Sequence, residues 1–391
     1  MKNNTSSVSR HVLPVIVLCQ FLCTSLWFAG NAVMPDLTAQ FQLPDSALGH
    51  LTTAVQLGFI VGTLIFALFS LADRVSPSLV FMVSALLGAA CNLTAMVPSN
   101  TFLTLWLGRF GTGFFLAGIY PVGMKIAADY FDKGLGRSLG FLVGALVLGT
   151  AFPHLLKSGA NLGPWQVVLW LTSGLAAAGG LVLWLTVPDG PHRRAAAGFN
   201  PRATWQVFKR PDFRSAALGY FGHMWELYAF WAFVPVFLAF YNARHGVHLP
   251  VALWSFAIIG IGFPACIGAG MLSQKWGARR VARAALLSSG LIGLLSPLVW
   301  WQGSPVVAVI FLLLWGIAVV ADSPMFSAVV AHNAPAEIKG TALTVVNSVG
   351  FAVTIVSIQL LTVMYAAGIT YYLGILLAVG PVVGLWYSRK K

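Results

Sequence analysis

Charged residues are scarce in this chain. Asp, Glu, Lys and Arg together make up only 8% of its 391 residues, whereas a soluble domain of ordinary composition contains about 25%. Apolar residues account for 58%, and the mean hydropathy is +0.83. Because so few charges leave no water-facing shell for a core of this size, the composition excludes an ordinary soluble protein and indicates a polytopic membrane protein.

Acidic residues in particular are few. The chain has 10 Asp and Glu against 23 Lys and Arg, which gives a formal net charge of +13. In a soluble protein this excess would suggest binding to nucleic acid. Here the basic residues gather in short loops between apolar runs, as they do in the cytoplasmic loops of membrane proteins, so we expect no nucleic-acid partner.

Cysteine is also scarce, and enzyme signatures are missing. The four cysteines lie in apolar runs and indicate packing residues rather than a disulfide framework: Cys19, Cys23, Cys91 and Cys266. Cys19 and Cys23 share a helix face, and His223 with Met224 adds soft ligands. No further Met or Cys cluster supports the alternative of soft-metal-ion transport. Without an HExxH motif or a nucleophile–base set, we predict no enzyme, cofactor or metal site.

Apolar runs of membrane-spanning length, about 20 residues at 1.5 Å each, follow one another along the chain. The first run is too long for the apolar segment of a signal peptide and lacks a small-residue cleavage site, so we interpret it as a span. The predicted spans cover residues 12–34, 48–71, 78–97, 102–126, 137–156, 166–187, 214–240, 250–273, 281–301, 305–330, 341–366 and 370–388. The predicted fold is an all-α polytopic membrane protein with twelve transmembrane helices.

The two halves of the chain resemble each other. Gly113 in the fourth run matches Gly316 in the tenth, and the turn at 71–78 corresponds to the turn at 272–280, with offsets of 200 to 203 residues. Between the halves, residues 188–214 carry six Lys and Arg. Two pseudo-symmetric bundles joined by a basic loop are typical of secondary transporters. The predicted division is an N-terminal six-helix bundle over 1–187, a cytoplasmic linker over 188–213 and a C-terminal six-helix bundle over 214–391.

Two loop motifs connect the chain with a known family. Residues 69–78 read FSLADRVSPS, and residues 270–280 read GMLSQKWGARR. Together with six plus six spans and a basic central loop, they resemble the loop motif of the major facilitator superfamily, roughly G-x-L-A-D-R-x-G-R-R. The first copy departs from it at Phe69 and at 76–78, and the second has Gln274 in place of the acid. The resemblance covers the whole chain and implies a monomeric secondary transporter with alternating access and a central site between the halves.

The two motif loops are expected to form a conformational latch. Asp73 lies at a helix end, where it can accept from the N-terminus of a neighbouring helix or pair with a loop cation. Breaking that contact would accompany inward opening. The alternative is a solvated turn with no such role. The predicted latch residues are Asp73, Arg74, Gly270, Lys275, Gly277, Arg279 and Arg280.

Arg109 is a candidate for coupling. It lies about eight residues into the fourth span, roughly 12 Å deep at helical rise. An unpaired Arg at such depth costs at least ~2.5–3.5 kcal/mol, so it must face a cavity or a partner. Arg109 with Gly113 resembles the R-x-x-x-G motif of the family's fourth helix, which is implicated in coupling in proton-coupled members. The alternative is a structural Arg that donates to neighbouring helix backbones.

His223 and Glu226 are candidates for proton exchange. They lie three residues apart in the seventh span and therefore share a helix face near the bilayer midplane. Burial favours the neutral form of both groups and brings them toward the range in which protons are exchanged. The alternative is a mutually satisfied His–Glu pair. Asp322 near Pro324 is a possible gate residue or second carrier. With Arg109, these residues form the predicted proton-coupling set.

The resemblance also implies that helices 1, 4, 7 and 10 line the substrate cavity. The candidate cavity residues are Gln20, Trp27, Asn31, Arg109, Tyr120, Tyr220, Tyr228, Trp231 and, from helix 11, Asn347. We therefore expect a proton-coupled secondary transporter of a small organic solute. Two alternatives stay open within this reading, namely proton-driven export of amphipathic compounds and, with less support, soft-metal-ion transport. The expected partners are a small-molecule substrate, protons and the lipid bilayer.

The basic loops predict the orientation of the chain. With the N-terminus inside, 20 Lys and Arg lie on the cytoplasmic side, only Lys157 and Arg244 lie on the opposite side, and Arg109 lies within the membrane. An even number of spans then places both termini in the cytoplasm of a multi-pass protein of the inner (cytoplasmic) membrane. A reporter fused after Lys391 that is active only in the cytoplasm should therefore be active. Activity of a periplasm-specific reporter at the same position would contradict this orientation.

Overall fold

The computed structural model describes residues 11–131, 135–159, 163–193, 206–335 and 338–388. These residues form helices and connecting turns, with no strand among them. The α-helices are α1 Val12–Thr24, α2 Ala29–Ala32, α3 Met34–Phe41, α4 Ala47–Leu68, α5 Leu71–Arg74, α6 Pro77–Leu93, α7 Phe102–Leu116, α8 Tyr120–Tyr130, α9 Leu135–Ser158, α10 Gln166–Thr186, α12 Pro211–His245, α13 Val251–Gly260, α14 Gly262–Trp276, α15 Ala278–Trp301, α16 Pro305–Ala321, α17 Ser323–Asn333, α18 Lys339–Ala366 and α19 Leu373–Ser388. Short 3₁₀ turns cover Thr94–Met96 and Thr370–Tyr372.

Within the described residues, eleven helical segments are long and apolar enough to cross a membrane, and a shorter apolar helix, α1, precedes them. The expectation of one continuous helix over 12–34 is wrong, because this span is divided into α1, α2 and α3. The hydroxyl groups at the end of α1 contribute to the break. Thr24 Oγ1 donates to the carbonyl of Gln20, and Ser25 Oγ donates to the carbonyl of Leu22. Such bonds compete with the backbone ladder.

Two further breaks lie at corresponding places in the two halves. α7 ends at Leu116 and α8 begins at Tyr120, directly before Pro121. α16 gives way to α17 at Asp322, and α17 begins at Ser323, directly before Pro324. Proline has no N–H for the helix ladder and is tolerated in the first turn of a new helix. The two prolines are 203 residues apart, so the breaks follow the same internal duplication as the sequence motifs.

Close helix contacts repeat with the same offset. A Cβ atom added at Gly113 would lie 2.0 Å from the carbonyl oxygen of Val55, and one added at Gly316 would lie 2.0 Å from that of Ile258. Gly316 lies 203 residues after Gly113, and Ile258 lies 203 residues after Val55. Glycine at these positions allows the backbones of α7 and α4, and of α16 and α13, to touch. The same packing solution therefore occurs in both halves.

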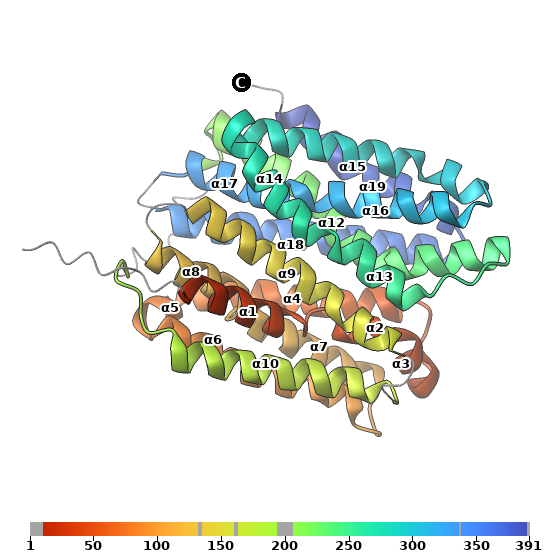
Figure 1. The fold of residues 1–391 in the computed structure, drawn as a ribbon, viewed down its shortest axis with the longest axis horizontal. Helices are drawn as coiled ribbons and strands as arrows, with labels where there is room; N and C mark the ends of the chain where they lie inside the picture. The colour runs from red at the N-terminus through yellow and green to blue at the C-terminus, as the bar shows by residue number, and fades with distance from the viewer. Residues whose placement is uncertain (1–10, 132–134, 160–162, 194–205, 336–337, 389–391) are drawn as a thin grey trace, which may run out of the picture.

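The helices of the first half lie together in Figure 1, and those of the second half lie above them. Within the first half, α4 packs against α7 and α6 against α10, and within the second half α12 and α15 pack against α19. The halves meet where α4 contacts α18 and where α9 contacts α13 and α14. The division at 187 and 214 stays a prediction, and residues 194–205 of the expected linker lie outside the described residues.

We call the end of the molecule at which α1 begins and α19 finishes the terminal end, and the opposite end the far end (Figure 1). The halves are in contact toward the far end. Gln359 Nε2 of α18 donates to Thr53 Oγ1 of α4 over 2.9 Å. One turn nearer the far end, Gly49 lies so close to Thr362 that an added Cβ would meet its Oγ1 at 2.0 Å. These contacts close the α4–α18 seam.

The repeated glycine contacts can be tested by adding one methyl group. Gly113→Ala and Gly316→Ala each place a Cβ against a backbone carbonyl, which cannot move as a side chain would. We expect each substitution to lower the stability by about 1–3 kcal/mol and to lower the unfolding temperature of the purified protein in detergent. Gly268→Ala on α14 is the matched control, because nothing lies within 4 Å of its added Cβ. Equal unfolding temperatures for all three variants would contradict these contacts.

Candidate functional site

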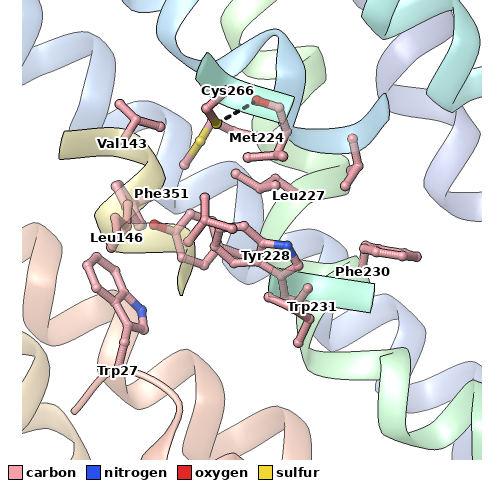
Figure 2. Packing of buried hydrophobic residues seen from close by; sticks show 14 of the residues in the cluster. Trp27, Val143, Leu146, Met224, Leu227, Tyr228, Phe230, Trp231, Cys266 and Phe351 are labelled. Atoms are coloured by element: carbon pink, nitrogen blue, oxygen red, sulfur yellow. Dashed lines mark hydrogen bonds between the residues drawn. The ribbon is translucent and has the colours of Figure 1, made fainter. Parts of the chain in front are cut away.

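Aromatic side chains from both halves meet at the centre of the protein. We define the aromatic cluster as Trp27, Phe59, Tyr228, Trp231 and Phe351, all of which are buried. The ring centroids are 5.4 Å apart for Trp27 and Tyr228, 5.7 Å for Trp27 and Phe351, and 4.4 Å for Phe59 and Phe351. Trp231 joins through Tyr228 at 5.1 Å. Figure 2 shows Trp27 approaching Tyr228 and Phe351 from the opposite half.

The break in the first span presents carbonyl groups to Arg109. Trp27 lies in the break between α1 and α2, where backbone carbonyls lose their helical partners. Arg109 Nη2 donates to the carbonyl of Trp27 over 2.6 Å, and Nη1 donates to that of Leu26 over 3.4 Å. Arg109 is only 4% exposed. Its positive charge also lies at the C-terminal end of α1, where the helix dipole favours a cation.

Asn31 extends this contact into a polar network. Arg109 Nη2 lies 3.4 Å from Asn31 Oδ1, and Asn31 Nδ2 donates to Thr52 Oγ1 of α4 over 2.7 Å. No carboxylate lies within ion-pair distance of Arg109 in the described part of the chain. Its geometry is that of the structural alternative considered above, in which the guanidinium donates to a neighbouring helix backbone. A coupling role for Arg109 stays a prediction.

The buried ionisable residues of α12 face the broken tenth span. His223 Nδ1 lies 2.7 Å from Asp322 Oδ1 at the junction of α16 and α17. Glu226 accepts from Trp315 Nε1 of α16 and from Ser289 Oγ of α15, each over 2.7 Å. His223, Glu226 and Asp322 are each 1% exposed. The alternative of a mutually satisfied His223–Glu226 pair is therefore wrong, because each residue has other partners.

The remaining predicted cavity residues lie in three places. Tyr220 of α12 donates through its hydroxyl to Asn347 Oδ1 of α18 over 2.9 Å, which joins two helices of the second half. Tyr120 begins α8 directly after the break in the fourth span. Gln20 instead lies inside the first half against Gly123 of α8, with both amide atoms buried and without a hydrogen-bond partner.

Two members of the aromatic cluster were not predicted from the sequence. Phe59 lies on α4, which is the second span, and Phe351 lies on α18, which is the eleventh span. The family resemblance directed attention to the first, fourth, seventh and tenth spans instead. Each is one Phe among 27 in the chain. No local signal separates a phenylalanine at a half–half contact from one that faces lipid, so only the packing of α4 against α18 identifies them.

The predicted latch residue Asp73 is bonded within its own half. Its Oδ1 lies 2.8 Å from Lys125 Nζ, and the same ammonium lies 3.5 Å from Asp129 Oδ2. Arg193, at the start of the expected linker, donates to the carbonyls of Asp73 and Val75 over 2.8 Å each. Sequence reasoning missed Arg193, since nothing in a basic loop distinguishes one Arg from the next.

In the part of the chain that the structure describes, the second motif loop contributes no ion pair to this group. Among the described residues, Lys275, Arg279 and Arg280 have no carboxylate within ion-pair distance, and Arg74 has none either. Added Cβ atoms at Gly270 and Gly277 would meet nothing within 4 Å. A latch between the two motif loops therefore stays a prediction, and the contacts of Asp73 describe one conformation only.

No group of three or more His, Cys, Asp or Glu side chains positioned to hold a metal ion occurs in the described ranges. All four cysteines are free thiols. Cys23 Sγ donates to the carbonyl of Ala176 over 3.3 Å, which is a packing contact between α1 and α10.

In the described residues, eleven helices of membrane-spanning length and the shorter apolar α1, arranged in two duplicated halves with buried ionisable groups between helices, are typical of a polytopic membrane transporter. The family model of the Major Facilitator Superfamily matches residues 16–358, and the chain belongs to this superfamily. The family predicted from the two loop motifs is confirmed, as are the all-α polytopic class and the two-half fold.

Relatives of this chain are also transporters by name. It is 29% identical over 189 residues to the putative uncharacterized transporter YgaY of Escherichia coli (strain K12), which covers 46% of each chain. It is 23% identical over 290 residues to inorganic phosphate transporter 1-2 of Oryza sativa subsp. japonica, covering 63% of this chain and 52% of the relative. The chain thus spans about half the length of the curated relatives it matches.

A solved structure shows the same fold over nearly the whole length. The crystal structure of a bacterial homologue of the human lysosomal transporter Spinster, in an inward-facing and unoccupied conformation, has a TM-score of 0.68. The alignment covers 98% of this chain and 96% of that one at 16% sequence identity. At this identity the likeness concerns the fold alone.

The contacts of Arg109 predict the effect of replacing it. Arg109→Ala leaves the carbonyls of Leu26 and Trp27 buried without donors, and each unsatisfied group costs about 1–3 kcal/mol. We expect a clearly lower unfolding temperature in detergent. Arg109→Lys keeps the charge but loses the planar set of donors, so its unfolding temperature should lie between those of Arg109→Ala and the unmodified protein.

Arg214→Ala is the control for this comparison, because Arg214 is an exposed Arg near the start of α12. It should unfold at the temperature of the unmodified protein. If Arg109→Ala were as stable as Arg214→Ala, the guanidinium would not be holding the broken first span.

Proposed function

We propose that this chain is a proton-coupled secondary transporter that moves a small organic solute across the cytoplasmic membrane by alternating access. Membership in a superfamily of transporters supports the transport activity. Two duplicated halves that meet along the α4–α18 and α9–α13–α14 seams supply two bodies that can rock about a central site. We further propose that the chain acts as a monomer, without enzymatic activity, with both termini in the cytoplasm.

The observation that carries the proton coupling is the buried His223–Asp322 pair at the break of the tenth span. Their Nδ1 and Oδ1 atoms are 2.7 Å apart, while His223 Nε2 and Asp322 Oδ2 are buried without a hydrogen-bond partner. A carboxyl or imidazole group with an unused valence can bind or release a proton when water reaches it. Ionisable residues inside membrane segments typically mark such relays.

Glu226 is the second member of this relay in our proposal. The sequence favoured Glu226 as the proton carrier, but both of its carboxylate oxygens already accept hydrogen bonds, from Trp315 and Ser289. We therefore place the exchanging proton first on Asp322 and His223. Other titratable groups packed near Asp322 are Glu226 on α12 and Cys266 on α14.

The break at Asp322 connects proton exchange with motion. α16 and α17 meet at this residue, and the proline that follows removes a backbone hydrogen bond. A change in the charge of Asp322 alters its attraction to His223, which lies on the neighbouring α12. Such a change therefore acts on a point where the tenth span can bend, which is what coupling requires.

A second candidate is the export of amphipathic compounds in exchange for protons. The aromatic cluster favours it, because its five rings present large apolar surface at the contact between the halves. Transport of inorganic phosphate, suggested by the name of the rice relative, is less well supported. A phosphate needs cationic donors, and both terminal nitrogens of Arg109 already donate to backbone carbonyls.

The proposed relay predicts three different effects of substitution. Asp322→Asn, which imitates a permanently neutral carboxyl group, should abolish accumulation driven by a pH gradient and preserve exchange of solute for solute. Glu226→Gln should reduce accumulation without abolishing it. His223→Ala should shift the pH at which accumulation is half-maximal, because Asp322 then lacks its partner.

Everted membrane vesicles with an acidic interior supply the assay. A pH-sensitive dye first identifies, from a library of small organic compounds, those that dissipate the gradient only when the protein is present. Accumulation and exchange of these compounds are then measured for each variant. Full accumulation by Asp322→Asn with protons as the only driving force would refute the assignment of the relay to this pair.

A further inference from the structure

Three buried polar side chains at the half–half contact lack hydrogen-bond partners. The indole nitrogens of Trp27 and Trp231 are buried donors without an acceptor, and both side chains are 1% exposed. Both amide atoms of Gln56 are also buried and unpartnered, with the residue at 0% exposure. Buried polar groups in native proteins nearly always have a partner, so three orphans in one region indicate that something else supplies it.

These three residues belong to one place. Trp27 and Trp231 both contact the ring of Tyr228, at 5.4 Å and 5.1 Å between centroids. Gln56 lies three residues before Phe59 and three after Thr53, so these residues follow one side of α4. Thr53 contacts Gln359 and Phe59 contacts Phe351, both on α18. Gln56 is therefore placed on the α4–α18 seam, beside the aromatic cluster.

Two charged groups near this region, Arg109 and Glu226, already have hydrogen-bond partners. Arg109 donates to the carbonyls of the first span, and Glu226 accepts from Trp315 and Ser289. An anion among the five rings would have to compete with these carbonyls for the donors of Arg109, and a cation would have to compete with Trp315 and Ser289 for the oxygens of Glu226. Either ion would lose its hydration for a partner that is already bonded, which is less favourable than binding of an uncharged solute.

We propose that the aromatic cluster with Gln56 binds the transported solute, and that this solute is an uncharged, planar heteroaromatic molecule. Its ring stacks between Trp27, Tyr228 and Phe351. Its acceptor atoms accept hydrogen bonds from the N–H groups of Trp27 and Trp231. The amide of Gln56 forms hydrogen bonds with a neighbouring donor and acceptor on the edge of the solute ring. This inference rests on the proposed transport function and adds the class of substrate.

The closed packing of the rings is consistent with such a site. Because the rings come from both halves, a movement that separates α4 from α18 opens the space between them. A quaternary ammonium ion also favours an aromatic cage. The two indole N–H groups would turn their positive ends toward such a cation, however, so the donors select an acceptor-bearing neutral ring.

Ligand-dependent thermal unfolding of the full-length purified protein tests the class of solute, because a compound that binds the folded state raises its unfolding temperature. Quinolin-2-one offers a ring carbonyl and a ring N–H, and coumarin offers the carbonyl without the N–H. Coumarin-3-carboxylate and N-methylquinolinium are the anionic and cationic counterparts. We expect dose-dependent stabilisation by the two neutral compounds and none by the two ions.

Three substitutions test the individual contacts. Trp27→Phe and Trp231→Phe keep an aromatic ring but lose the N–H donor and part of the ring area, so each should weaken binding of both neutral compounds by at least about 3- to 10-fold. Gln56→Leu should weaken the binding of quinolin-2-one more than the binding of coumarin. Trp301→Phe is the matched control, since Trp301 is 73% exposed at the end of α15, and it should bind like the unmodified protein.

The binding assay uses no pH gradient, so its result is independent of the proton relay, and Asp322→Asn should bind quinolin-2-one normally. Unchanged affinity in both Trp→Phe variants would overturn the site. Stabilisation by either ion but by neither neutral compound, or by none of the four, would overturn the substrate class. If proton-driven transport were observed while neither neutral compound bound, this inference would fail and the proposed function would stand.

Discussion

The bonds from Arg109 to the broken first span are the interaction on which the centre of this protein depends. A helix interrupted inside a membrane exposes carbonyl groups that water cannot reach, and the guanidinium of Arg109 supplies the missing donors. The same break places Trp27 against Tyr228 of the opposite half. One buried cation therefore stabilises the irregular backbone and, through it, the position of a ring at the contact between the halves.

The breaks in the fourth and tenth spans show how a duplicated fold carries different residues at corresponding places in its two halves. Pro121 and Pro324 occupy corresponding positions and interrupt their helices in the same way. The break before Pro121 carries apolar residues and glycine, whereas the break before Pro324 carries Asp322, which lies beside His223. The proline break is common to both halves, whereas the carboxyl group that pairs with His223 belongs to the second half alone.

Much of the architecture could be predicted because lipid leaves a chain few choices. Spans, loop charges and the motif loops identified the fold and family, since each is written in local composition. The partners of buried polar residues could not be predicted. Glu226 and His223 share a helix face as expected, yet their partners, Trp315, Ser289 and Asp322, lie 63 to 99 residues further along the chain.

The sequence by itself determined that this protein spans a membrane with two duplicated six-helix halves, because apolar length and internal offsets are properties of the chain alone. The tertiary structure decided that the first span is broken, that Arg109 holds the break, and that Phe59 and Phe351 join the central rings. The tertiary structure also decided which buried polar groups remain without a hydrogen-bond partner. Hydrogen bonds and ring contacts depend on which helices become neighbours, and that choice is made only when all the helices pack together.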